Sequence, residues 1–424
     1  MVIGYFNACE IETKQKKGVT YMSLQKNGAS LKGTFSKAVA FSAALLTLTG
    51  SVGSLSAAYD PCCPPEPYCP APAWDPCACE MPDLVIYADF LYWQVHPEGL
   101  EFVRSGGFSP SAISTIDQTG SIVSPSCELE PGFRVGMIVD LGCCNWDFYA
   151  QYTWLHQCFG DTLTAENHPD LQPLIYNQAI GQNQFVFDPS IEEQVGLGPL
   201  SLASAQYDAT FNVLDFGLGR TFAVNNCFDF RPHLGFKATW QDIKYDVRYA
   251  RDAVLNDAGT DELVPAQTVD IHNKTDFDGI GLRSGFDAKW RFSPCFSVVG
   301  GVAVSAVWSD ICTYRQDTLT QNETATKNID LKQDTCALIP VTELLLGLQY
   351  DTTWCDTDIF VFVGWENQVW WNLNRFIYIE NSTLLSPILE PDVVPANVGT
   401  NNIQFGPHGN VTYQGLTVRA GFGF

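Results

Sequence analysis

The chain has 424 residues, a formal net charge of −24 and a sequence pI near 4.4, which argues against binding nucleic acid through a basic surface. Charged residues make up only 17% of the chain and aromatic residues 13%, and 34 residues are glycine, a composition typical of strands and turns. After residue 58, no stretch reaches the roughly 18 uninterrupted apolar residues of a membrane helix. A membrane protein with this sequence is therefore expected to be a β-barrel.

The first 58 residues have the features of an export signal. Three lysines precede an apolar run at residues 38–48, and the small residues at 56–58 are suited to signal cleavage. Met22 is an alternative start, because the residues before it fit no region of a signal peptide. We expect a cleaved signal peptide and a mature chain that begins near Tyr59 in an oxidising compartment.

Residues 59–82 form a segment rich in proline and cysteine, with thiols at Cys62, Cys63, Cys69, Cys77 and Cys79. Its prolines exclude a helix or a central strand. Metal binding by the last two cysteines is one interpretation, but neither a histidine cluster nor a Cys-x-x-Cys pair accompanies them. We favour a periplasmic segment whose cysteines form cross-links within or between chains.

Residues 83–424 contain ten segments with the period-two alternation of β-strands. The first strand is expected at Leu84–Trp93 and the last at Leu416–Phe424. Between them lie four hairpins, at residues 133–154, 214–240, 280–308 and 344–370. Every hairpin has a short turn that contains cysteine: Cys143 and Cys144, then Cys227, Cys295 and Cys355.

Long polar segments alternate with these short turns and are expected to be loops, at residues 96–131, 157–205, 251–276, 311–340 and 372–410. Outer-membrane barrels have short periplasmic turns and long extracellular loops. The predicted fold class is therefore all-β, a transmembrane antiparallel β-barrel of about ten strands, or of 12–16 if segments such as 184–187 add strands. A soluble β-sandwich is the alternative, because alternation alone does not distinguish the two.

The polar faces of the predicted strands carry many charged side chains, which suits a wet lumen. Such charges would set the ion preference of a pore; alternatively, they pair across neighbouring strands and fill a narrow lumen. The pore-lining candidates are Asp89, Arg134, Asp140, Asp147, Asp215, Asp229, Arg231, His233, Lys237, Arg283, Asp287, Lys289, Arg291, Glu343, Glu366 and Arg419.

Two features of the strand pattern predict local detail. The alternation changes phase near Val213 and Leu214, where we expect a β-bulge. The final strand ends on an aromatic residue, and its apolar face resembles the C-terminal signal read by the barrel-insertion machinery of Gram-negative bacteria. That face comprises Leu416, Val418, Ala420, Phe422 and Phe424.

No local motif indicates catalysis, a cofactor or a metal site. Of the six histidines, five lie in or beside the long polar segments and only His233 lies on a predicted strand. A nucleophile with histidine and carboxylate partners cannot be assembled. The aspartates of the long segments lack the spacing of a calcium-binding loop.

Three features of the chain resemble the Legionella-type major outer membrane protein family, which is also abundant in chlamydia-like bacteria. They are the stretch Tyr87–Trp93, which reads Tyr-Ala-Asp-Phe-Leu-Tyr-Trp, the cysteine-bearing turns and the terminal Phe424. The resemblance covers most of residues 84–424. It implies a β-barrel porin that is often disulfide-linked in the outer membrane.

We therefore expect a general diffusion porin of a Gram-negative outer membrane, in contact with membrane lipid and passing ions and small solutes. The N-terminal and periplasmic-turn cysteines would link it to other cysteine-rich envelope proteins or to a second copy. The remaining thiols would staple the outer loops: Cys127, Cys158, Cys312 and Cys336. A structural coat or adhesin barrel with little conductance is the main alternative, and an outer-membrane enzyme comes third.

Overall fold

The computed structural model describes residues 84–106, 120–142, 145–168, 170–175, 177, 186–187, 194–195, 200–255, 263–354, 357–382, 400–404 and 409–424. The chain divides into units at residues 1–64 and 65–424, and every described residue belongs to the second. The expected signal peptide and the Cys/Pro-rich segment lie outside the described residues. No helix in the described part of the chain is long and apolar enough to cross a membrane.

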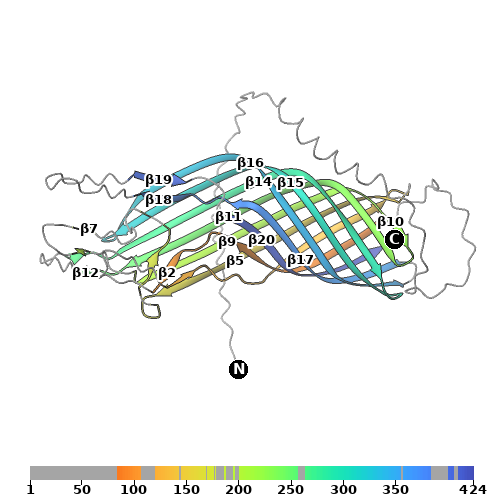
Figure 1. Ribbon diagram of the computed structural model, residues 1–424, viewed down its shortest axis with the longest axis horizontal. Helices are drawn as coiled ribbons and strands as arrows, with labels where there is room; N and C mark the ends of the chain where they lie inside the picture. The colour runs from red at the N-terminus through yellow and green to blue at the C-terminus, as the bar shows by residue number, and fades with distance from the viewer. Residues whose placement is uncertain are drawn as a thin grey trace, which may run out of the picture. The chain divides into compact units, whose positions relative to one another are not determined.

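Ten long antiparallel strands pair edge to edge into a closed barrel (Figure 1). Around the barrel the strands are β11 (Phe228–Arg251), β14 (Gln267–Arg291), β15 (Phe296–Gln321), β16 (Thr324–Trp354), β17 (Thr357–Asn374), β20 (Gly409–Gly423), β1 (Leu84–Pro97), β4 (Glu130–Asp140), β5 (Trp146–Thr164) and β9 (Leu202–Arg220). The strands at the two ends of this order, Phe228–Arg251 and Leu202–Arg220, also pair with each other, so the cylinder has no open edge.

The two ends of the barrel sequence meet in one ladder. β1 pairs with β20 along its length, with Asp89 opposite Arg419. At the end of this ladder the Leu84 amide donates to the Phe424 carbonyl at 3.1 Å, and the Phe424 amide donates to the Leu84 carbonyl at 3.0 Å. The predicted ten-strand antiparallel barrel, with its first and last strands as neighbours, is therefore confirmed.

The other described strands are short and add no member to the cylinder. β10 (Phe222–Asn225) pairs only with β11, and the rest form small separate sheets, so the barrel itself does not exceed ten strands. The segment predicted at 184–187 contains β7, which pairs with β8 and not with the barrel. Figure 1 shows these small sheets at the end of the barrel away from β10 and the C-terminus. They comprise β2 (Val103–Ser105), β3 (Ser121–Val123) and β6 (Gln172–Pro173); β7 (Val186–Phe187) and β8 (Gln194–Val195); β12 (Val254–Leu255) and β13 (Leu263–Val264); and β18 (Tyr378–Ser382) and β19 (Thr400–Gln404).

An apolar belt surrounds the barrel on its outer face. Large apolar side chains that would be buried in a soluble protein are exposed here: Leu346 is 59% exposed and Ile280 is 55% exposed. Tryptophans lie toward both margins, with Trp240 and Trp308 at one and Trp290 at the other. Aromatic girdles around an apolar band are the pattern that lipid selects on a barrel surface.

Several strands are much longer than a membrane requires. A tilted strand crosses the bilayer in about 9–11 residues, whereas β11 has 24 residues and β16 has 31. Beyond Trp240 the outward side chains of β11 become charged, as at Lys244 and Arg248, while the inward ones become apolar, as at Ile243 and Tyr249. Each long strand therefore has a lipid-facing part with a polar interior and an outer extension with an apolar interior.

This inversion of polarity corrects two expectations. The predicted bulge near Val213 is wrong, because β9 pairs with β5 and with β11 without a register shift. Val213 is buried inside the barrel and Leu214 lies on the outer face, as strict alternation requires. The pattern changes phase because lipid gives way to water outside the strand at this level.

The predicted loop at residues 311–340 is also wrong. These residues continue β15 and β16, which are joined by a two-residue turn at Asn322 and Glu323, with φ of 49° and 61°. Positive φ at both positions is the geometry of a tight hairpin turn. The segment reads as a polar loop because its outward face meets water and not lipid.

A charge placed on the apolar belt will destabilise the folded barrel. Leu346→Arg is expected to lower the free energy of unfolding by about 2–4 kcal/mol, because the introduced guanidinium would face hydrocarbon. Thr162→Arg is the matched control, since Thr162 is exposed on the outer extension of β5. The unfolding midpoint of each variant is measured by urea titration in lipid vesicles, with heat-modifiable gel mobility as the readout. Equal midpoints for the two variants would contradict this placement of the belt.

Candidate functional site: the charged interior of the barrel

Most inward-facing charged side chains are paired within the membrane-spanning part of the barrel. Among the described residues, seven basic and eight acidic side chains form these ion pairs, so the interior is nearly balanced in charge. The basic ones are Arg134, Arg231, Lys237, Arg283, Lys289, Arg291 and Arg419, and the acidic ones are Asp89, Asp147, Asp215, Asp229, Asp287, Glu343, Asp351 and Glu366.

Asp89 is at the centre of the first group of ion pairs, and its side chain is fully buried. It accepts from Arg419 Nε at 2.8 Å and from Arg134 Nη1 at 3.1 Å, because β1 lies between the strands that carry these arginines. Arg134 also donates twice to Glu366 of β17, with Nη2 to Oε1 at 2.8 Å. One arginine thus connects β4 to β17 across the two intervening strands.

The second group is centred on Glu343 and Lys237. Lys237 Nζ lies 2.8 Å from Asp215 Oδ1 on the neighbouring strand and 3.0 Å from Glu343 Oε1 on β16. Arg283 of β14 donates to Glu343 with Nη2 to Oε2 at 2.8 Å. Lys237 is completely buried, so its charge depends on these partners and not on water.

Polar side chains join the two groups. Tyr87, whose ring lies 4.4 Å from the Arg419 guanidinium carbon, donates its hydroxyl to Gln151 Oε1 at 2.9 Å. Gln151 Nε2 in turn donates to Asp215 Oδ2 at 3.1 Å. The side chains of the resulting network come from every barrel strand except β15.

A third set of pairs lies nearer the short turns and is more accessible to water. Arg231 donates to Asp147 and, with Nη1, to Asp287 Oδ2 at 2.8 Å. Lys289, whose side chain is 26% exposed, donates to Asp351 Oδ1 at 2.9 Å. Gly219 permits the first pair, since a Cβ at that position would lie 2.6 Å from Arg231 Nη2.

The structure brings most of the predicted interior residues into these pairs. His233 is buried among them, with Nδ1 3.4 Å from Arg283 Nη1, while Arg291 pairs with Asp229 nearer the turns. Asp140 lies apart from the pairs at the end of β4, where its Oδ1 accepts from the Gly142 amide at 2.9 Å. Sequence reasoning missed Tyr87 and Gln151, which alternate with apolar neighbours but carry no charge.

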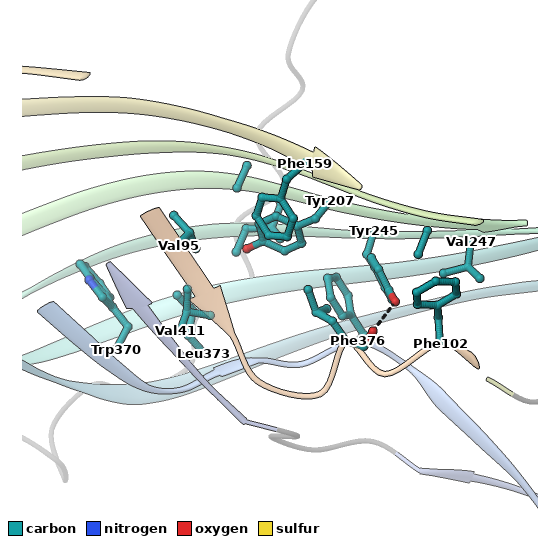
Figure 2. Packing of buried hydrophobic residues seen from close by; sticks show 14 of the residues in the cluster. Val95, Phe102, Phe159, Tyr207, Tyr245, Val247, Trp370, Leu373, Phe376 and Val411 are labelled. Atoms are coloured by element: carbon teal, nitrogen blue, oxygen red, sulfur yellow. Dashed lines mark hydrogen bonds between the residues drawn. The ribbon is translucent and has the colours of Figure 1, made fainter. Parts of the chain in front are cut away.

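Beyond the belt the interior is filled by apolar side chains, many of them aromatic (Figure 2). Sequence reasoning missed this apolar core, although its period-two signal is visible at the edges of the segments predicted as loops and in the residues beside them. Its inward-facing members include Leu155, Phe159, Leu163, Tyr207, Phe211, Val213, Ile243, Tyr245, Val247, Tyr249, Val269, Ile271, Phe277, Val307, Ile311, Trp370, Val411 and Tyr413.

Two segments outside the barrel strands contribute to this apolar core. Figure 2 shows Phe102, which precedes β2, and Phe376, which follows β17, among side chains of the barrel wall. Tyr245 OH donates to the Leu100 carbonyl at 2.7 Å, and Arg315 Nη1 donates to the Ile377 carbonyl at 2.9 Å. Hydrogen bonds from the wall therefore hold both segments inside the outer part of the barrel.

Three of the described cysteines expected to staple loops do not do so. Cys127, Cys312 and Cys336 are free thiols, so the predicted staples that use them are wrong. Cys158 belongs to β5, and Cys312 and Cys336 belong to β15 and β16. These positions are strands because the barrel extends beyond the membrane.

The outward thiols of β15 and β16 lie beside carboxylates. Cys336 Sγ donates to Asp310 Oδ1 at 3.0 Å, and this hydrogen bond raises the pKa of the thiol. A hydrogen bond with Asp334 likewise raises the pKa of Cys312. The thiolate is therefore disfavoured at both positions, which lowers their reactivity.

The periplasmic-turn cysteines are only partly described. Cys295 is a half-buried free thiol in the turn between β14 and β15, and Cys227 is buried in the turn before β11. Cys143, Cys144 and Cys355 lie outside the described residues, as do the five N-terminal cysteines. The described residues include no group of three or more His, Cys, Asp or Glu side chains that could hold a metal ion.

A closed antiparallel barrel with an apolar outer belt and a charged interior is a transmembrane β-barrel of the bacterial outer membrane. The profile of one family, described as Legionella pneumophila major outer membrane protein precursor, matches residues 76–417. The chain belongs to this family.

No curated protein matches the chain. Among solved structures, the outer membrane protease OmpT from Escherichia coli is 10% identical, with a TM-score of 0.35, and the match covers 82% of this chain and 97% of that one. A FadL homologue of Pseudomonas aeruginosa is 8% identical (TM-score 0.21), covering 81% and 90% of the respective chains. The toluene transporter TodX of P. putida is 7% identical (TM-score 0.21) with the same coverage. Similarities of this size carry no argument about function.

Removing the charge of Asp89 will leave the buried guanidinium of Arg134 and the partly exposed one of Arg419 short of a partner. Asp89→Asn is expected to lower the free energy of unfolding by about 3–5 kcal/mol. Asp270→Asn is the control, because Asp270 pairs with Arg248 on the exposed outer face and should contribute less than about 1 kcal/mol. Equal unfolding midpoints in urea would contradict the central position of Asp89.

Proposed function

We propose that this chain is a porin of narrow bore that lets ions and small polar solutes diffuse across the outer membrane. The observation that carries the proposal is the charged lining of the membrane-spanning part, which involves nearly every barrel strand. Charged groups in a barrel interior are accommodated by water and by one another. A wet interior between two aqueous compartments provides the route.

The ion pairs restrict what this route can pass. Arg134 and Glu343 reach partners beyond their neighbouring strands, so side chains occupy part of the cross-section. Ten strands enclose much less space than the roughly 16 of wide channels. With seven basic and eight acidic side chains in pairs, the local field favours neither ion sign strongly.

Reconstituted protein is expected to give channels of low conductance with a reversal potential near zero in a salt gradient. Lys289→Glu should shift that potential toward cation preference, because Lys289 is inward-facing and partly hydrated. Lys332→Glu is the control, since Lys332 lies on the exposed outer face with 61% of its side chain accessible. Planar-bilayer recordings without channel activity would contradict the porin proposal.

A structural barrel with little conductance is the second candidate, and the apolar core favours it. Trp93, Phe211 and Trp370 are fully or almost fully buried where the charged interior ends. A core packed in this way would close the lumen unless water passes along part of the wall. The same bilayer recordings separate the two functions.

We also propose that periplasmic cysteines tie the barrel into a disulfide-linked envelope, through other cysteine-rich proteins or a second copy. Cys295 supports this: its thiol is free, half-buried and in a short turn. Cys127 differs, because it packs against the apolar core, where burial raises the pKa of its thiol.

Isolated envelopes are expected to show disulfide-linked oligomers on non-reducing gels that collapse to monomer with reductant. Cys295→Ser should weaken this ladder, because it removes an accessible thiol. Cys127→Ser is the matched control and should leave the ladder unchanged. Monomer in the absence of reductant would contradict cross-linking.

Export and insertion complete the proposal. A signal peptide cleaved near Tyr59 would deliver the chain to the periplasm, and the final strand would then serve as the insertion signal. The outward exposure of Phe422 and Phe424, at 49% and 65%, supports this role for the final strand. A lipid-facing aromatic end is available for recognition until the barrel closes.

A further inference from the structure

β15 differs from the other barrel strands because it contributes no charged side chain to the ion-pair network. Its inward positions in the membrane-spanning part are all neutral. They are small or carry a hydroxyl at Gly301, Ala303, Ser305 and Ser309, and they are valine at residues 299 and 307. Only at its outer end does β15 carry an inward ion pair, between Arg315 and Asp317. The charged network therefore leaves one stretch of wall with short neutral side chains.

Unpartnered polar atoms lie on this stretch and on the strands beside it. Among the described residues, Ser305 Oγ, Thr275 Oγ1, Asn273 Oδ1, Gln368 Oε1 and Trp370 Nε1 are buried without a hydrogen-bond partner. All five residues are at least nine-tenths buried. They belong to β14, β15 and β17, and the register of β16 brings two of them to one level, since Val341 lies opposite both Ser305 and Trp370.

The packing also loosens along this wall. The inward residues Leu331, Gln333, Thr335 and Ala337 of β16 are only half-buried, whereas every inward residue of β9 from Ala203 to Val213 is buried. The wall formed by β1, β4, β5 and β9 has unpartnered oxygens on Gln157 and Tyr207, but their inward neighbours are apolar. On β11, two unpartnered nitrogens belong to Arg251 at the outer end of the strand. The β14–β17 side therefore combines unpartnered polar atoms with the less completely buried outer end of β16.

A buried polar group without a partner costs about 1–3 kcal/mol, and water relieves this cost where space allows. We propose that the permeation path follows the β14–β17 wall, with water bonded to the unpartnered atoms, and that its narrowest level lies at Ser305, Val307 and Ile339. This inference rests on the porin proposal and gives it a route and a solute class. The path takes small polar solutes and small ions, because hydroxyl and amide groups line it and the aromatic core bounds it.

Thiol labelling tests the path without relying on conductance. Ser305→Cys and Ala209→Cys each place a small thiol at a buried inward position, the first on the proposed path and the second on the apolar wall. A charged methanethiosulfonate reagent is applied to folded protein in vesicles, and peptide mass spectrometry reads each site separately from the native thiols. Heat-modifiable mobility verifies that both variants are folded.

Labelling at residue 305 is expected to be at least about tenfold faster than at residue 209, because the reaction requires a hydrated thiolate. Labelling at residue 305 should also lower single-channel conductance by at least about half, since the added group narrows the path. Equal rates, or faster labelling at residue 209, would overturn the path.

The two proposals fail in different ways. Fast labelling at residue 305 in a barrel without conductance would support the hydrated wall and refute the porin. A conducting barrel with an unreactive thiol at residue 305 would support the porin and refute this route. A conducting barrel whose current is unchanged after complete labelling at residue 305 would likewise refute the route.

Discussion

The structure depends on one constraint, the closure of a hydrogen-bonded sheet in a solvent that offers the backbone no partners. Lipid cannot bond to a free amide or carbonyl, so a sheet that crosses it must have no edge. Here the ladder between β1 and β20 removes the last edge, down to the paired Leu84 and Phe424 backbones. Once the cylinder is closed, alternation assigns each residue either to the lumen or to the outer surface.

The surroundings of the outer face then change along each long strand, and the interior changes with them. Within the belt the outer face meets lipid and the charged side chains turn inward. Beyond the belt the outer face meets water, and the hydrophobic effect drives the apolar side chains inward. Burial of each large side chain there contributes about 1.5–3 kcal/mol, whereas a buried ion pair contributes little beyond its own desolvation cost. The apolar core therefore stabilises the extension, while the ion pairs neutralise the lumen.

These two interiors bear on function in opposite directions. The charged part is polar and suits the passage of polar solutes, while the aromatic part restricts it. In the proposed path both limits relax along β15, because this strand carries no charged side chain within the belt and the outer end of the neighbouring β16 is less completely buried. In the proposed path, conduction depends on residues such as Ser305 as well as on the charged side chains.

Much of the fold was predictable from the sequence because period-two alternation is a local property. The strand number, the first and last strands and the short turns all follow from it, and the charged side chains fall on one face by the same rule. The outer ends of the strands were missed, since polar outward residues such as Lys332 and Asp334 read as loop when lipid is assumed outside. The bulge expected near Val213 has the same origin. The hydrophobic pattern does change there, but because lipid gives way to water outside the strand and not because an extra residue is inserted.

By itself, the sequence determined a ten-strand antiparallel barrel with an apolar belt and charges on the opposite face, because each of these depends on neighbours along the chain. Only the tertiary structure decided which charges meet, since Arg134 and Glu366 are 232 positions apart and join only when the cylinder closes. It also decided that the outer half is packed with aromatic side chains, because that packing requires strands and connecting segments that are distant in sequence. Closure converts a one-dimensional alternation into a three-dimensional interior, and alternation alone carries no information about partners across that interior.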